Sequence, residues 1–140
     1  MAVRVRLRVT SRYGGEVPTP ALVNSGFEAE TPQLLLPRGL ASILNLWPPP
    51  PEAQLIEVGT AGGPVRNYIV PRALQVWVET EDRRVGPIEC DAMISLLEYE
   101  VLISDMLGGE LGIVILDLRG KWRFTDEDKV RSTEPPRYWF

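Results

Sequence analysis

The chain has 140 residues, a length typical of one domain with its own hydrophobic core. Hydrophobic residues make up 44% and charged residues 24%, a balance too apolar for a disordered chain, and the net charge of -4 disfavours a nucleic-acid partner. The sequence contains no histidine and one cysteine, Cys90, which excludes His-dependent nucleophilic catalysis, an internal disulfide and a cysteine zinc site. Any acid–base chemistry must therefore come from Asp or Glu, with Lys or Tyr.

The first ten residues alternate apolar side chains with arginines, whereas a signal peptide needs a continuous apolar stretch. The apolar runs elsewhere are far shorter than the roughly 18 residues that span a membrane. We therefore expect a soluble, cytoplasmic protein without a membrane partner. The 13 prolines and the excess of arginine over lysine favour a thermophilic source.

Strand patterns dominate the first half of the chain. Alternation over residues 3–10 predicts a half-buried strand, and a glycine turn at 13–15 leads to a second strand over 17–23. Its early part is expected to be an edge or a loop, because it contains two prolines. Residues 33–36 form a short apolar strand. Leucine spacing after Pro37 predicts a helix over 38–45, with Pro37 at its start and the proline run 48–51 beyond its end.

Hairpin patterns fill the second half. Strands are predicted at 54–59 and 65–70 around a turn at 61–64, then at 74–78 and 85–94 around a charged turn at 81–84 whose side chains should lie in water. A short helix follows near 106–111, and 112–117 should pair with 121–124. This pattern predicts an all-β fold: a small closed barrel with one or two short helices.

An apolar strand that runs into Asn24, Ser25 and Gly26 resembles the active-site loop of retropepsin-like aspartic peptidases, whose triplet is Asp-Thr-Gly or Asp-Ser-Gly. The order of later features agrees with that family: the strand and helix after residue 33, the Gly-rich hairpin at 59–68, and the apolar segments at 100–107 and 111–115. The resemblance assigns residues 1–124 to a retropepsin-like domain and 125–140 to a C-terminal tail.

The resemblance implies a homodimer, because each domain supplies one triplet and the catalytic site lies on the two-fold axis. Two carboxylates held close together share a proton, so one activates water while the other polarises the peptide carbonyl. Ser25 would bond across the dimer, and Gly26 would let the two loops approach. The implied substrate is an extended peptide or unfolded protein, with no metal and no cofactor. The flap over it would comprise Thr60, Ala61, Gly62, Gly63, Pro64 and Val65.

Residue 24, however, is Asn where the family has its catalytic Asp. An amide carries no negative charge to accept a proton, so the chain as written should be inactive or nearly so. Three explanations stay open: an engineered Asp→Asn replacement, a natural relative that binds without cutting, and an ordinary turn residue. Ser104 is a second departure, at a position where the family usually has Gly.

Two other functions remain as alternatives: a non-catalytic module for peptide binding, protein binding or assembly on the same fold, and an unrelated small-ligand barrel. Glu28 and Glu30 are interpreted as solvated surface residues, Asp105 as a helix N-cap and Cys90 as a small buried side chain. The aromatic residues 138–140 and the strand at 3–10 are predicted to contribute to the dimer contact.

Overall fold

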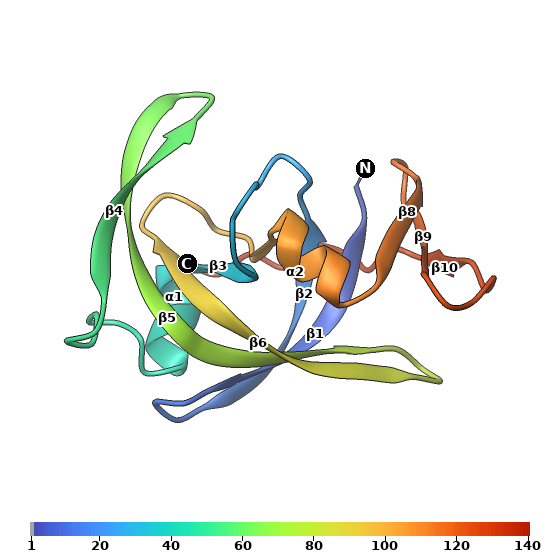
Figure 1. Ribbon diagram of the computed structural model, residues 1–140, viewed down its shortest axis with the longest axis horizontal. Helices are drawn as coiled ribbons and strands as arrows, with labels where there is room; N and C mark the ends of the chain where they lie inside the picture. The colour runs from blue at the N-terminus through green and yellow to red at the C-terminus, as the bar shows by residue number, and fades with distance from the viewer. Residues whose placement is uncertain (1) are drawn as a thin grey trace.

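A computed structural model describes residues 2–140 as ten strands and two short helices (Figure 1). The mostly-β barrel with two short helices expected from the sequence is confirmed. In residues 2–140 neither helix is long and apolar enough to cross a bilayer. The elements are β1 (Arg4–Ser11), β2 (Glu16–Val23), β3 (Gln33–Pro37), α1 (Arg38–Ile43), β4 (Gln54–Thr60), β5 (Gly63–Glu79), β6 (Arg84–Ser95), β7 (Leu102–Ile103), α2 (Asp105–Glu110), β8 (Ile113–Asp117), β9 (Lys121–Phe124) and β10 (Arg131–Ser132).

Seven strands form one sheet in the order β1-β2-β7-β3-β6-β5-β4. An additional pairing of β1 with β5 closes the first six of these into a barrel and leaves β4 as an edge strand. The pairs β2–β7 and β3–β6 are parallel, and the others are antiparallel. Because side chains alternate along a strand, Val5, Leu7 and Val9 of β1 fill the barrel interior, while the arginines between them face outward.

Strand β3 is buried along its whole length because both of its faces are covered. Leu34 and Leu36 point into the barrel core, whereas Leu35 packs on the outer face against Met93 and Leu102. The short apolar run predicted from the sequence therefore contributes to two separate hydrophobic clusters, one inside the barrel and one on its outer face.

Strand β5 is a single strand of 17 residues, where the sequence predicted separate strands at 65–70 and 74–78. Its pairing with β6 shifts register between Val70 and Leu74. Arg72 lies within this irregularity with a left-handed φ of 50°, and its N–H donates to Asp91 Oδ1 at 2.8 Å. The irregularity bends the strand, so its first half leaves the barrel with β4 as a projecting hairpin (Figure 1).

The structure decides two expectations that rest on prolines. Pro18 and Pro20 lie inside β2, which pairs with β1 along its length, so of the two expected possibilities for this segment, an edge or a loop, the edge is confirmed. Its other edge bonds to a neighbouring strand only at Leu22 and Val23, which leaves the proline positions free of a second partner. Pro37 is the N-cap of α1, and the helix ends at Ile43, two residues before its predicted end.

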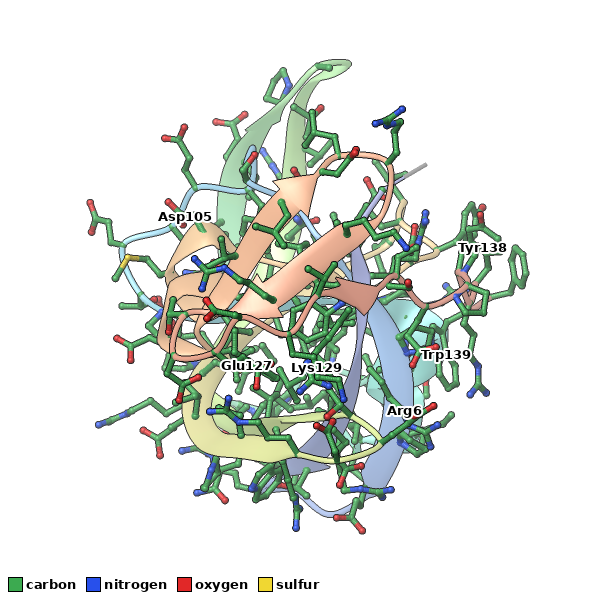
Figure 2. The ribbon with its side chains drawn as sticks, turned by 90° about the vertical axis from the view of Figure 1, so that its right-hand side faces the viewer. Arg6, Asp105, Glu127, Lys129, Tyr138 and Trp139 are labelled. Atoms are coloured by element: carbon green, nitrogen blue, oxygen red, sulfur yellow. The ribbon has the colours of Figure 1, made fainter. Side chains whose placement is uncertain are left out.

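The charged turn between β5 and β6 is exposed at Glu81, Asp82 and Arg84, as expected, but two of its side chains also form ion pairs within the chain. Asp82 accepts from Arg131 at 2.7 Å, and Arg83 donates to Asp126 at 2.7 Å, so the turn is tied to the segment around β10. Arg131 is 92% buried at its side chain and also bonds Glu127 at 2.8 Å. β10 pairs with β9, which extends the predicted β8–β9 hairpin to three strands (Figure 2).

The last residues fold back onto the barrel of their own chain (Figure 2). Trp139 is only 8% exposed; its Nε1–H donates to Thr19 Oγ1 at 3.1 Å, and its backbone N–H donates to the Tyr99 carbonyl at 2.6 Å. Tyr138 and Phe140 stay exposed. The central aromatic residue is thus an intrachain anchor, and a dimer role for its neighbours stays a prediction.

The ion-pair cluster predicts an acid-dependent stability. Arg131 holds the pKa of Asp82 and of Glu127 below their ordinary values of 3.8 and 4.5, and Arg83 does the same for Asp126. Depressed carboxyl pKa values stabilise the fold above the unfolded pKa, and this contribution disappears as pH falls towards the folded values. We expect the melting temperature to drop between about pH 5 and pH 2, and to drop less in Arg131→Met.

The control is Arg66→Met, which removes an exposed arginine that forms no ion pair among the described residues. Thermal unfolding followed by circular dichroism across this pH range measures both variants. An Arg131→Met curve with the same acid slope as the wild type contradicts the assigned role of the cluster.

Candidate functional site

A groove of about 900 Å³ lies over the outer face of β3, β6 and β7. The loop after β2 forms one wall and the β4–β5 hairpin the other; both lie on the same side of the barrel in Figure 1. The floor is apolar, because Leu35, Met93 and Leu102 form a separate hydrophobic cluster there, with Phe27, Ile56 and Val58 packed against it. Such a floor can accept apolar side chains of a ligand.

The predicted triplet stands at the end of β2. The backbone N–H of Asn24 donates to the Ile103 carbonyl at 3.2 Å, which continues the β2–β7 pairing by one residue. Its side-chain Oδ1 accepts from the N–H of Gly26 at 3.0 Å, and its carbonyl accepts from Phe27 at 3.0 Å. A Cβ on Gly26 would lie 3.2 Å from that Oδ1, so glycine suits the tight turn. Asn24 and Gly26 line the groove, while Ser25 is exposed.

Helix α2 holds this loop in place. The N-cap is Ser104, not the predicted Asp105: Ser104 Oγ accepts from Leu107 N–H at 3.1 Å and from Gln33 N–H at 3.1 Å. Asp105, in the first turn, instead accepts from Ala29 N–H at 3.0 Å and donates its own N–H to the Phe27 carbonyl at 2.9 Å. The serine that departs from the family pattern therefore ties α2 to β3, and its neighbour ties α2 to the loop.

The predicted flap is the tip of the β4–β5 hairpin. Three of its six predicted residues, Thr60, Ala61 and Val65, line the groove. The other three do not: Gly62 forms the turn together with Ala61, and Gly63 and Pro64 begin β5. Gly63 has a φ of 108°, which an L side chain rarely adopts, so glycine is required there. The structure therefore brings half of the predicted flap and two residues of the triplet to one groove.

Sequence reasoning missed several residues that complete the groove. Ser95 Oγ accepts from the N–H groups of Leu97 and Glu98 at 3.2 and 3.1 Å, which shapes the loop that forms the rim. Asn67 is buried in the opposite wall. One signal was available: Asn67 interrupts an otherwise apolar alternation between Val65 and Ile69. The remaining missed lining residues are Phe27, Ala29, Gln33, Leu35, Ile56, Glu57, Val58, Gly59, Met93, Leu97, Glu98 and Leu102.

Three other residues, Cys90, Glu28 and Glu30, are interpreted from the sequence as non-catalytic. Cys90 is buried, and burial strongly raises the pKa of its thiol, which disfavours the nucleophilic thiolate. Glu28 and Glu30 are exposed, and Glu28 lies on the groove. Residues 2–140 contain no group of three carboxylate or cysteine side chains placed to hold a metal ion.

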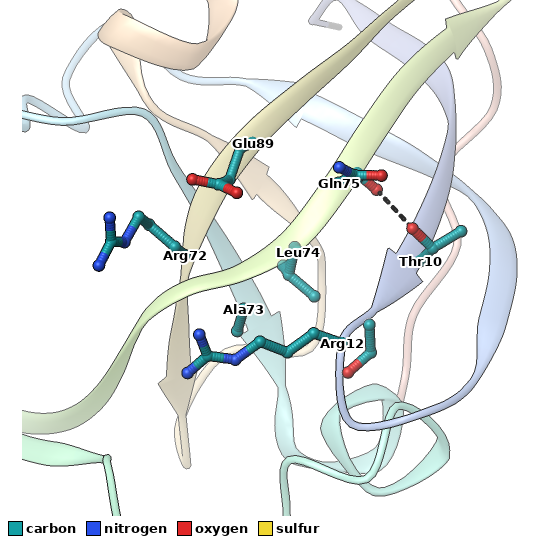
Figure 3. A pocket seen from close by; sticks show the side chains of 8 residues that line it. Thr10, Arg12, Arg72, Ala73, Leu74, Gln75 and Glu89 are labelled. Carbon is teal, nitrogen blue, oxygen red and sulfur yellow. Dashed lines mark hydrogen bonds between the residues drawn. The ribbon is translucent and has the colours of Figure 1, made fainter.

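A second, smaller depression of about 450 Å³ lies over the end of β1 where it pairs with β5, beside Glu89 of β6 (Figure 3). Its lining is mostly polar, including Thr10, Gln75 and Glu89, with Arg12 and Arg72 at its edge (Figure 3). It lacks the apolar floor and the two facing loops of the groove, so the groove is the stronger candidate site.

No family model matches the chain, and no curated protein matches its sequence. The geometry of the groove therefore carries the functional argument.

The dual role of Ser104 predicts a clear loss of stability in Ser104→Ala. The variant leaves two N–H groups without their acceptor at a residue that is only 1% exposed. We expect the free energy of unfolding to fall by about 1–3 kcal/mol, measured by urea denaturation.

Ser42→Ala is the matched control, because the exposed Ser42 hydroxyl only donates to the Arg38 carbonyl in its own helix. That change should stay within about 0.5 kcal/mol. Equal stabilities of Ser104→Ala and Ser42→Ala contradict the assigned capping role.

Proposed function

We propose that the chain is a homodimeric, retropepsin-like homologue that binds extended peptides in the groove and, with Asn at position 24, does not cut them efficiently. The observation that carries the proposal is the placement of the Asn24 turn opposite the β4–β5 hairpin across an apolar floor. These are the two parts, loop and flap, that the family resemblance requires to face one another.

The edge position of β4 supports binding of an extended chain. β4 is the last strand of its sheet and pairs with β5 alone among the described strands. Its free N–H and C=O groups can add a peptide strand by backbone hydrogen bonds, and the apolar floor can take alternate side chains. A hairpin that projects from the barrel suits this role.

The chemistry of residue 24 decides between binding and cleavage. The Asn24 amide accepts a hydrogen bond from Gly26, as a carboxylate could in the same turn, but it carries no charge to activate water. Replacing the amide NH₂ with an oxygen introduces a carboxylate and leaves the hydrogen bond from the Gly26 N–H possible. Asn24→Asp is therefore the smallest change that can create the paired carboxylates of an aspartic peptidase.

We expect Asn24→Asp to cleave unstructured peptides at acid to neutral pH at least about 100-fold faster than the wild type, since general acid–base groups contribute roughly that much. Asn24→Ala is the control, because it lacks both the charge and the hydrogen-bond acceptor. An aspartic-peptidase inhibitor should stop the new activity. Cleavage should also require the dimer, which molar-mass measurement by light scattering tests on the same samples.

A second candidate, a non-catalytic binding or assembly module, is favoured by one observation: the Asn24 side chain already serves the turn through its bond to Gly26. Peptide binding by the wild type, combined with no cleavage by a folded, dimeric Asn24→Asp variant, would select this candidate. Absence of both binding and cleavage would overturn the proposed function.

A further inference from the structure

One wall of the groove contains an asparagine that is largely buried but whose amide has no hydrogen-bond partner among residues 2–140. Asn67 is 4% exposed and lines the groove, and none of the side-chain hydrogen bonds among residues 2–140 involves it. Its backbone pairs with Ile56 of β4, and its side chain lies on the same face of β5 as Val65 and Ile69. Among the described residues the fully buried side-chain polar atom without a partner is Trp122 Nε1, so the Asn67 amide keeps some contact with solvent in the groove and is accessible to a ligand there.

Asn67 lies at the point where strands β5 and β6 separate. The β5–β6 ladder ends at the pair Tyr68–Ile94, and Asn67 is the first residue of β5 beyond it. Ser95 follows Ile94 on β6 and also lines the groove. An extended chain in the groove therefore passes the Asn67 amide, whose oxygen and NH₂ match one backbone N–H and one C=O of a peptide.

Charge at the rim selects the kind of peptide. The groove is lined by Glu28 and Glu98, from two different loops, and by no arginine or lysine. Neither carboxylate forms an ion pair among the described residues. Glu57 touches the groove from β4, but strand alternation places its carboxylate on the face opposite Ile56, beside Arg66 of β5. Two free negative charges thus flank an apolar floor.

We propose that the groove binds an extended peptide segment with basic side chains, its backbone bonded to the Asn67 amide and its positive charges facing Glu28 and Glu98. This inference rests on the proposed function and names the class of its ligand. The apolar floor takes the side chains that alternate with the basic ones. Specificity then comes from the rim charges, because the backbone contacts and the floor accept many sequences.

The test compares three fluorescent, unstructured peptides that share their apolar residues and carry two Arg, two Gln or two Glu. Anisotropy titration of the wild-type chain should give the tightest binding for the Arg peptide and the weakest for the Glu peptide. In the double variant E28Q/E98Q the advantage of the Arg peptide over the Gln peptide should shrink by about two- to tenfold. Raising the salt concentration should shrink it in the wild type too.

E110Q is the matched control, because Glu110 is an exposed carboxylate at the end of α2 that does not line the groove. It should bind all three peptides as the wild type does. Equal binding of the Arg and Gln peptides, or an unchanged preference in E28Q/E98Q, overturns the basic-peptide inference and leaves the proposed function standing. Failure of all three peptides to bind overturns the proposed function itself, and the inference with it.

Asn67→Leu tests the buried amide separately. Leucine has the same number of side-chain heavy atoms and a similar branched shape but no polar group, so the variant should be about as stable as the wild type, while every peptide binds about fivefold more weakly. A strongly destabilised Asn67→Leu assigns the amide a structural role and overturns its part in the inference. Unchanged peptide binding by a stable Asn67→Leu variant also overturns the part of the amide in the inference.

Discussion

The pairing of β5 with three neighbours is the constraint on which the rest of the structure depends. Its second half bonds β1 and β6 and closes the barrel, while its first half carries β4. Between them Arg72 adopts a left-handed conformation that costs about 1–3 kcal/mol for a residue other than glycine. The hydrogen bond from its N–H to Asp91 offsets part of that cost. The direction of the hairpin, and thus the wall of the groove, follows from this irregularity in the pairing of β5 with β6.

Much of the fold could be predicted because its strands repeat simple patterns. The alternation of valine and leucine with arginine in β1 reflects one buried and one solvated face, and this pattern needs no tertiary information. The continuity of β5 could not be predicted in the same way. Pro71 and Arg72 interrupt the alternation as a turn would, and only the partners on both sides show that the strand continues.

Only the part of the site formed by residues close together in the sequence could be predicted. Asn24 and Gly26 lie two positions apart and form one turn, so a motif could identify them. Asn67 and Glu98 reach the groove from distant segments, through strand register and a loop shaped by Ser95. Likewise, the bond between Asp82 and Arg131 joins residues 49 positions apart, and local charge patterns could not reveal it.

The loop between Ser95 and β7 is fixed at both ends. Ser95 Oγ binds its start, while Glu100 pairs with Arg4 and the Tyr99 carbonyl accepts from Trp139 near its end. Folding has therefore already removed most of the conformational freedom of this rim. A ligand that contacts it loses little affinity to ordering the protein, which is the advantage of a preorganised surface. The anchor provided by Trp139, which does not itself line the groove, thus helps to keep the groove ready for a ligand.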